Sequence, residues 1–115
     1  MSPTGPSTVP EITATELKEA LDEGRDLVLV DVRELFEKSI ADLPERGQLR
    51  IPVSDLPGQM HRIPREGWVV MYCRSGARSG MATQFLRGQG WEGVVNLKGG
   101  VLAWREEVDP SVAAY

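Results

Sequence analysis

Cysteine, histidine and long apolar runs are scarce in this sequence of 115 residues. Its single cysteine, Cys73, has no partner for a disulfide within the chain, whereas small secreted domains usually carry several paired cysteines. No apolar run reaches the roughly eighteen residues that a membrane span needs. The first ten residues also lack the basic start and apolar stretch of a secretory signal. We therefore expect a cytoplasmic protein with a free thiol and no membrane association.

The scarcity of histidine and of positive charge limits the ligands. The only histidine is His61, and no group of Cys, His, Asp or Glu has the spacing of a zinc site, so we expect no metal and no cofactor. We interpret His61 as a surface residue. Lys and Arg number 13 against 17 Asp and Glu, which gives a formal net charge of -4. Because phosphate binding depends on clustered basic residues, we expect no nucleic acid partner.

The length is typical of one domain with one core. Residues 1–10 contain three prolines together with Ser, Thr and Gly, and we expect them to form a flexible N-terminal tail. Residues 11–115 then form the domain. No repeat or low-complexity block follows Pro10, so a solenoid is not supported.

Strand and helix patterns alternate along the chain. Apolar, β-branched runs predict strands at residues 27–32, 49–51, 68–72 and 94–97. Helical spacing, capping residues and glycines predict helices from a capping box at residues 13–16 to Gly24, at 34–40, from 54 to 63, at 78–89 and after Gly100. In the fourth of these, Met81, Ala82, Phe85 and Leu86 are expected to form one apolar face. Alternation of this kind predicts an α/β fold with a mainly parallel sheet.

The three tryptophans, Trp68, Trp91 and Trp104, are expected to pack in the core or at its rim. Two polar residues, Asp31 and Cys73, come at the carboxyl ends of predicted strands. In open α/β sheets, ligands bind beyond those ends. We therefore expect the functional site there.

The segment from Cys73 to Ser79 carries the clearest chemical signal. A thiol at the end of a strand is followed by the small residues Ser75, Gly76 and Ala77 and then by a helix. Successive backbone N–H groups in such a loop can surround an anion, and the N-terminus of the helix adds partial positive charge. Arg74 and Arg78 add full charges. A lowered thiol pKa would make Cys73 a nucleophile without a general base, because the thiolate is the reactive form.

Several residues of this region resemble the rhodanese family. They are the Asp31-Val32-Arg33 segment with Glu37, Ile51-Pro52 with Leu56, the stretch from Tyr72 to Ser79, and Gly99-Gly100 with Trp104. Each fragment is weak alone, but their order and spacing together are specific, and the resemblance extends from about Ile12 to Pro110.

The resemblance implies a rhodanese-like α/β fold, a five-stranded mainly parallel sheet with helices on both faces. It implies a sulfurtransferase of the thiosulfate sulfurtransferase type, in which Cys73 carries sulfane sulfur as a persulfide. The donor would be a small molecule such as thiosulfate and the acceptor cyanide or a thiol, with a protein persulfide as a further partner. The substrate-binding loop would be Arg74, Ser75, Gly76, Ala77, Arg78 and Ser79. Asp31 and Arg33 would support the loop.

Other interpretations stay open at this point. Cys73 could be an inert core residue, Arg74 and Arg78 solvated surface charges, and Asp31 a helix cap. The domain could relay sulfur or bind a partner with little turnover of small molecules. A cysteine phosphatase is disfavoured, since related phosphatases have five residues between cysteine and arginine and this chain has four. An arsenate reductase would need an external thiol, because the chain has no second cysteine.

The sequence departs from the family at one place. Where the family commonly has Gly-His-Ile-Pro, this chain reads Ala41-Asp42-Leu43-Pro44, and a longer connection leads to Ile51. We therefore expect the entrance of the site to differ.

Overall fold

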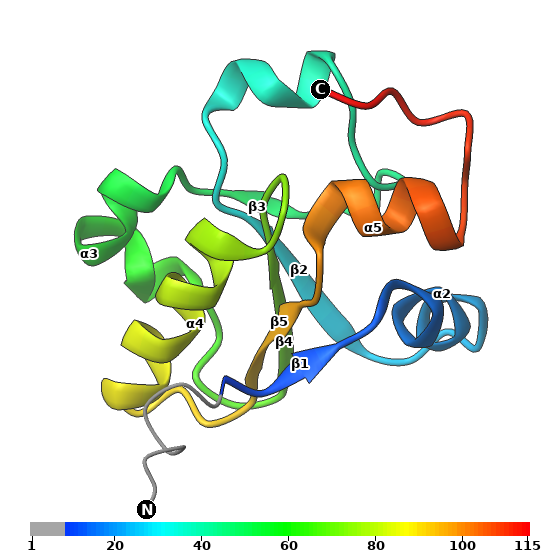
Figure 1. Cartoon of the computed structure of the whole chain (residues 1–115). Helices are drawn as coiled ribbons and strands as arrows, with labels where there is room; N and C mark the ends of the chain where they lie inside the picture. The colour runs from blue at the N-terminus through cyan, green and yellow to red at the C-terminus, as the bar shows by residue number, and fades with distance from the viewer. Residues whose placement is uncertain (1–8) are drawn as a thin grey trace, which may run out of the picture.

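A parallel sheet forms the centre of residues 9–115, which are the residues that this computed structural model describes (Figure 1). Within that range the sheet has five strands in the order β1-β5-β4-β2-β3, and every neighbouring pair is parallel. The strands are β1 (Glu11–Ile12), β2 (Leu27–Asp31), β3 (Leu49–Arg50), β4 (Trp68–Tyr72) and β5 (Val94–Leu97). The predicted α/β fold is confirmed, and only the short β1 was not predicted.

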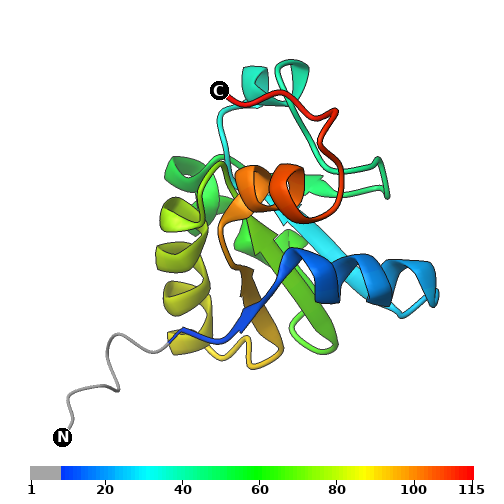
Figure 2. The same ribbon diagram turned by 45° about the vertical axis from the view of Figure 1, so that its right-hand side comes forward.

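Helices cover both faces of the sheet. In Figure 2 as in Figure 1, α2 (Ala14–Asp22) and α5 (Gly100–Glu107) lie on one face, and α4 (Ala77–Gly88) lies on the other with α3 (Leu56–Gln59). Three 3₁₀ segments complete the described elements: η1 (Leu35–Ser39), η2 (Val53–Asp55) and η3 (Met60–Arg62). The helix predicted from 54 to 63 is therefore broken into three short pieces.

Local sequence explains why α2 begins where it does. The Thr13 hydroxyl accepts a hydrogen bond from the Glu16 amide at 3.0 Å, and the Glu16 carboxylate accepts one from the Thr13 amide at 2.9 Å. This is the predicted capping box, which satisfies two N–H groups that the first helical turn would leave free.

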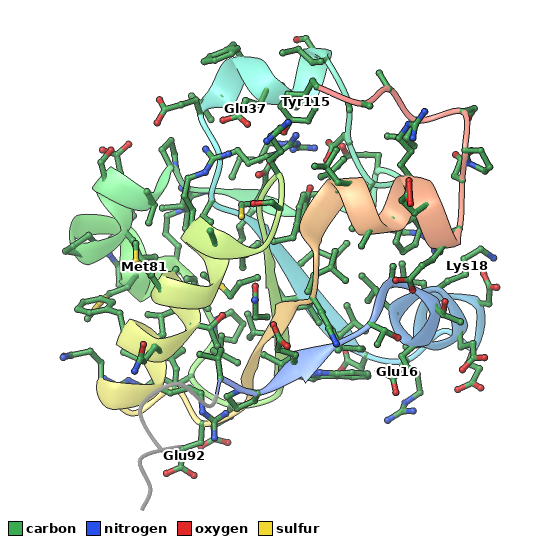
Figure 3. All side chains as sticks on the ribbon, viewed as in Figure 1. Glu16, Lys18, Glu37, Met81, Glu92 and Tyr115 are labelled. Atoms are coloured by element: carbon green, nitrogen blue, oxygen red, sulfur yellow. The ribbon has the colours of Figure 1, made fainter. Side chains whose placement is uncertain are left out.

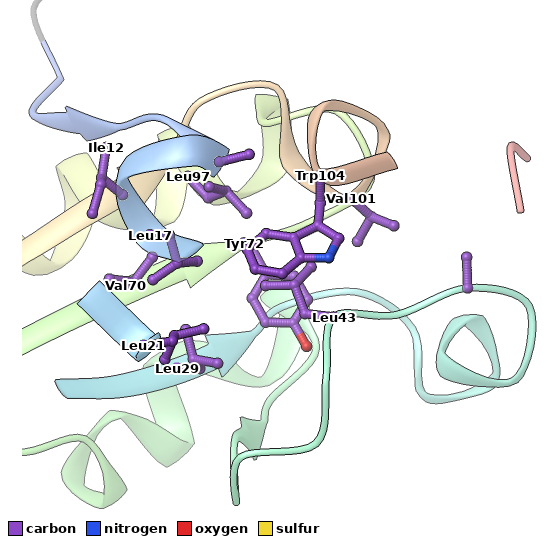
Figure 4. Packing of buried hydrophobic residues seen from close by; sticks show 12 residues of the cluster. Ile12, Leu17, Leu21, Leu29, Leu43, Val70, Tyr72, Leu97, Val101 and Trp104 are labelled. Carbon is purple, nitrogen blue, oxygen red and sulfur yellow. The ribbon is translucent and has the colours of Figure 1, made fainter. Parts of the chain in front are cut away.

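The core is divided by the sheet into two apolar clusters. On the α2 and α5 side, Tyr72 and Trp104 belong to one buried cluster with Leu17 and Leu97 (Figure 4). The other cluster lies under α3 and α4 and includes Cys73 at its upper end. Trp91 and Trp104 are buried and Trp68 packs at the rim, as predicted.

The apolar face predicted for α4 is wrong in part. Ala82 and Leu86 are buried against the sheet, but 67% of Met81 and 39% of Phe85 are exposed. Adjacent residues of a helix point about 100° apart, so a row at 82 and 86 can face the sheet while the row at 81 and 85 turns to its side. There Met81 and Phe85 line a shallow apolar groove with Val53, Leu56 and Pro57.

The tail predicted for residues 1–10 falls mostly on residues 1–8, which lie outside the described residues. The main-chain oxygen of Pro10 accepts a hydrogen bond from the Asn96 amide at 2.8 Å, so Pro10 is attached to the sheet edge. In the part of the chain that is described, no helix is both long enough and apolar enough to cross a membrane.

Candidate active site

Cys73 directly follows the central strand β4 and is 1% exposed. Strand pairing places Asp31 opposite Tyr72, so Asp31 and Cys73 end neighbouring strands at the same edge of the sheet, as predicted. The thiol lies at the bottom of the loop that leads into α4. Because the sulfur packs on one side against the apolar cluster under α3 and α4, the groups of the loop on its other side decide whether it is inert or reactive.

Hydrogen-bond donors from the start of α4 surround the sulfur. The Gly76 amide lies 3.1 Å from Cys73 Sγ, and the Ser79 amide lies 3.4 Å away. The Ser79 hydroxyl is 3.3 Å from the same atom. Gly76 is the N-cap residue of α4 with φ of 99°, a left-handed conformation that glycine adopts without strain. The predicted turn of backbone amides toward the sulfur is therefore present.

The N-terminus of α5 holds the loop from below. The Val101 amide donates to the main-chain oxygen of Cys73 at 2.9 Å, and the Leu102 amide donates to that of Arg74 at 3.0 Å. In a trans peptide the N–H points opposite to the C=O. With their carbonyls bound to α5, the peptides after Cys73 and Arg74 therefore direct their N–H groups away from α5, toward the mouth of the loop.

These contacts set the pKa of the Cys73 thiol. Burial raises the pKa, but hydrogen bonds from the Ser79 hydroxyl and from the amides of Ser79, Gly76 and Ser75 lower it by more. The net result is a pKa below that of an ordinary thiol. Donors aimed at a charge stabilise the charged form, and the thiolate is the nucleophile. The interpretation of Cys73 as an inert core residue does not fit this environment.

Asn96 on β5 controls the Ser79 hydroxyl. The Asn96 amide nitrogen donates to the Gly76 main-chain oxygen and to Glu11, both at 3.2 Å, which directs its oxygen to Ser79. The Ser79 hydroxyl lies 2.6 Å from that oxygen. A hydroxyl has one proton, so Ser79 donates either to Asn96 or to Cys73. The amides of Ser75, Gly76 and Ser79 are thus the permanent donors to the sulfur.

The two arginines of the loop are bound at its outer side. Both terminal nitrogens of Arg78 donate to the carboxylate of Glu37 on η1, at 2.8 and 3.1 Å. This ion pair lowers the pKa of Glu37 to about 2. Arg74 donates from Nε to the main-chain oxygen of Tyr115, and its guanidinium lies 5.3 Å from the centre of the Tyr115 ring. Both side chains are fixed by partners, so neither is a freely solvated surface charge.

Asp31 and Arg33 form a buried ion pair beneath η1. The Asp31 carboxylate accepts from Nε of Arg33 at 2.8 Å and from Arg50 at 2.8 Å. Burial lowers the pKa of Arg33, but hydrogen bonds from Arg33 to Asp31 and Tyr115 outweigh it and raise that pKa. The alternative that Asp31 is a helix cap is wrong, because η1 begins after Glu34, which is its N-cap.

Asp42, which lies where the sequence departs from the family pattern, joins the ion pair of Asp31 and Arg33. Its carboxylate accepts hydrogen bonds from Arg33 at 3.1 Å, Arg50 at 2.8 Å and the Tyr72 hydroxyl at 2.7 Å. The connection from Asp42 to β3 is therefore bound to the strand ends by partly buried charges. The network reaches the Cys73 loop through Glu37 of η1 and through Tyr115, and it also binds the hydroxyl of Tyr72, the residue before Cys73.

The structure brings together most of the residues that the sequence singled out. Ser75, Gly76 and Ser79 surround Cys73, Ala77 begins α4, and Arg74 and Arg78 lie at the outer side. Sequence reasoning missed the contacts of Asn96 and Tyr115 and the hydrogen bonds to the loop from the residues after Gly100, and it quoted Glu37 without a role. Only for Gly100 was there a signal, the Gly99-Gly100 pair. Within residues 9–115 no cluster of His, Cys, Asp and Glu could hold a metal ion.

Fold and site together define an α/β protein with a nucleophilic cysteine in an amide-lined loop. The chain belongs to the rhodanese-like domain family, whose model matches residues 13–107. A sulfurtransferase of Allochromatium vinosum is 40% identical over 91% of this chain and 96% of its own length.

Two further relatives are matched over very different shares of their own length. A probable adenylyltransferase/sulfurtransferase, MoeZ of Mycobacterium tuberculosis, is 35% identical over 90% of this chain, which spans 26% of MoeZ. The solved structure of the human single-domain sulfurtransferase TSTD1 is 31% identical, with a TM-score of 0.71, over 87% of this chain and 98% of that one. These likenesses support a role in sulfur transfer.

Proposed function

We propose that this protein is a sulfurtransferase that carries sulfane sulfur on Cys73, with thiosulfate as a donor and cyanide or a thiol as acceptor. The observation that carries the proposal is the convergence of the Gly76 and Ser79 amides on Cys73 Sγ, at 3.1 and 3.4 Å. Such donors stabilise a thiolate, and they also suit the terminal sulfur of a persulfide, which is an anion of similar size.

The reaction has two displacements. The Cys73 thiolate attacks the outer sulfur of thiosulfate, the sulfur–sulfur bond of the donor breaks, and sulfite leaves with the electron pair. Cyanide then attacks the outer sulfur of the persulfide, so that thiocyanate forms and the Cys73 thiolate is released. No proton transfer is needed in either step, which agrees with a loop in which amides and not a histidine contact the sulfur.

We assign the substrate-binding role to residues of the same loop. Arg74, Ser75, Gly76, Ala77, Arg78 and Ser79 form it. Ser75, Gly76 and Ser79 supply hydrogen-bond donors, Ala77 leaves space, and the two arginines attract an anionic donor. Asp31 and Arg33 support the loop indirectly, through the segment that carries Glu37.

Intact-protein mass spectrometry after incubation with thiosulfate tests the proposal. We expect a gain of one sulfur atom on Cys73 and its loss when cyanide is added. The Cys73→Ser variant should gain nothing and should form no thiocyanate, whereas Ser54→Ala, a change at an exposed residue of η2, should behave as the wild type. A wild-type protein that gains no sulfur while a known rhodanese does would refute the proposal.

A relay between proteins is the second candidate. The chain has one cysteine and so needs a second molecule to take its sulfur. The longer relative MoeZ, of which this chain spans 26%, is described as a probable adenylyltransferase/sulfurtransferase. A persulfide that forms on Cys73 only from a protein persulfide, with negligible thiosulfate turnover, would favour this version. The assignment to the cytoplasm stays a prediction from cysteine usage.

Phosphate ester hydrolysis is disfavoured by the surroundings of Arg78. A phosphatase loop uses its arginine fork to bind two phosphate oxygens, but here both terminal nitrogens of Arg78 bind the Glu37 carboxylate. The loop also has only four residues, 74–77, between Cys73 and Arg78. Comparing turnover of an aryl phosphate, arsenate and thiosulfate would separate the three activities.

A further inference from the structure

Tyr115 connects the two arginines that flank Cys73, although it lies 37 residues or more from both in the sequence. The described chain returns after α5 and brings Tyr115 beside η1, next to Glu37 (Figure 3). Its main-chain oxygen and its ring contact Arg74. Its hydroxyl donates to Glu37 at 2.9 Å, and Glu37 in turn holds Arg78.

The direction of these hydrogen bonds is fixed. Nη1 of Arg33 lies 2.7 Å from the Tyr115 hydroxyl oxygen, and a guanidinium can only donate. The hydroxyl therefore accepts from Arg33, and its single proton goes to Glu37. Arg33 is itself held by Asp31 and is 1% exposed. The phenol is thus fixed from below by a buried, immobile cation.

This arrangement matters for the charge at the mouth of the loop. The Glu37 carboxylate and the Cys73 thiolate are both among the groups that raise the pKa of Arg78, Glu37 more strongly, so Arg78 lies within electrostatic reach of the sulfur. Arg74 is a long exposed side chain on the loop itself. Without the Tyr115 side chain, Arg74 would lose the ring contact that restricts its rotamers, and the main-chain oxygen that it binds would lose its anchor to Arg33 and Glu37.

We propose that Tyr115 is a positioning residue that fixes Arg74 directly, and Arg78 through Glu37, so that the Cys73 loop selects anionic over neutral reagents. Its consequence for turnover rests on the proposed function, because the selected anion would then be the sulfur donor. The charge selection itself does not require sulfur transfer. It can be measured on the thiol alone.

The test compares alkylation of Cys73 by anionic iodoacetate and by neutral iodoacetamide. The measured quantity is the rate constant for iodoacetate divided by that for iodoacetamide. We expect Tyr115→Ala to lower this ratio by about threefold or more, as loss of partly screened charge interactions predicts. Tyr115→Phe keeps the ring contact with Arg74 and loses only the hydrogen bonds of the hydroxyl with Glu37 and Arg33, so it should lower the ratio by about half as much. Ser111→Ala removes only a bond to Asp109 within the same segment and should leave the ratio unchanged.

A double-variant comparison shows whether Tyr115 acts through Arg74. If it does, Tyr115→Ala should lower the ratio less in an Arg74→Ala background than in the wild type, because coupled residues are not additive. Equal effects in both backgrounds would contradict the direct connection. Circular dichroism spectra and melting temperatures of all variants check that they fold. If Tyr115→Ala does not fold, Tyr115→Phe takes its place in the comparison.

Turnover separates the two proposals. With thiosulfate, Tyr115→Ala should raise KM by about the same factor as the alkylation ratio falls, with kcat within about twofold. A ratio that is unchanged in Tyr115→Ala, or one that rises because an obstruction has been removed, overturns the positioning role. Failure of the wild type to gain sulfur refutes only the proposed function, since the alkylation ratio still tests Tyr115.

Discussion

Gly100 lies against the main-chain oxygen of Cys73, so closely that a Cβ on Gly100 would be 2.4 Å from that oxygen. The same Cβ would be 2.6 Å from the main-chain oxygen of Arg74, and Gly100 has φ of 60°. Both oxygens accept hydrogen bonds from the residues that follow Gly100. The close approach of α5 to the loop therefore requires a residue without a side chain at this position.

Replacing Gly100 should damage the loop more than the fold. We expect Gly100→Ala to reduce the free energy of unfolding by about 1 to 3 kcal/mol, from strain and steric clash, and to reduce the rate of Cys73 persulfide formation by more than about tenfold as the amides move. Urea unfolding and mass spectrometry measure the two effects. Gly88→Ala is the control, since its Cβ would meet nothing within 4 Å. A Gly100→Ala protein that keeps full reactivity would show that α5 does not shape the loop.

The Ser79 side chain should matter for the acidity of Cys73. We expect Ser79→Ala to raise the pKa of the thiol, because burial would remain while one of the donors that oppose it is lost. The thiolate would then form at higher pH than in the wild type. Since a hydrogen bond to a charged group contributes about 1.5 kcal/mol, turnover near neutral pH should fall by about tenfold.

The ultraviolet absorbance of the thiolate, followed as a function of pH, gives the pKa directly. With one cysteine in the chain, comparison with the Cys73→Ser variant isolates its signal. Ser54→Ala serves as the matched serine control. An unchanged midpoint in Ser79→Ala would mean that the hydroxyl donates only to Asn96 and that the amides alone stabilise the thiolate.

The ion pair between Glu37 and Arg78 should make stability depend on acid pH. Arg78, as the main cause, lowers the pKa of Glu37 from 4.5 to about 2. The stabilisation is therefore fully present above about pH 4.5 and is lost as the pH falls toward 2. We expect Glu37→Gln to be less stable than the wild type by about 2 kcal/mol near neutral pH, because Arg78 is partly exposed and the pair partly screened.

Urea unfolding at a series of pH values measures this difference, which should shrink toward zero as the pH approaches 2. The exposed Glu66 offers a control, and Glu66→Gln should differ little from the wild type at every pH. A Glu37→Gln penalty that stays constant from neutral to acid pH would exclude the carboxylate charge as its source.

Removal of Asp31 should be costly because it takes the main ion-pair partner from the buried Arg33 and leaves only the less buried Asp42. The side chain of Arg33 is fully buried and that of Asp31 is 4% exposed. We expect Asp31→Ala to reduce the free energy of unfolding by about 3 to 5 kcal/mol. Asp26→Ala, at an exposed position before β2, should change it by less than about 0.5 kcal/mol.

The double variant Asp31→Ala with Arg33→Met tests the cause. It removes both charges, so it should recover a large part of the stability lost in Asp31→Ala. Denaturant unfolding of the three proteins gives the comparison. Should the double variant be no more stable than Asp31→Ala, the loss comes from packing or from Arg50 and not from a buried charge.

Local sequence patterns predicted most of the fold, because they reflect interactions between residues close in the chain. The capping box at Thr13 and Glu16 fixed the start of α2, and the apolar runs at Trp68–Tyr72 and Val94–Leu97 fixed two central strands. The apolar face predicted for α4 was right for Ala82 and Leu86 only. Helical spacing identifies the apolar residues of a helix, but it does not say which of two adjacent rows packs against the sheet. β1 was missed because two residues carry no periodicity.

The sequence by itself determined that the one thiol follows a buried strand and precedes a glycine-containing turn into a helix, which is local chemistry. Only the tertiary structure decided which groups hold that turn. Asn96 and Gly100 reach it from β5 and α5, and Tyr115 reaches it through Arg74 and Glu37, over separations of 20 to 78 residues. Contacts between segments so far apart depend on the packing of the sheet and its helices, and apart from the Gly99-Gly100 pair no local pattern marks the residues that make them.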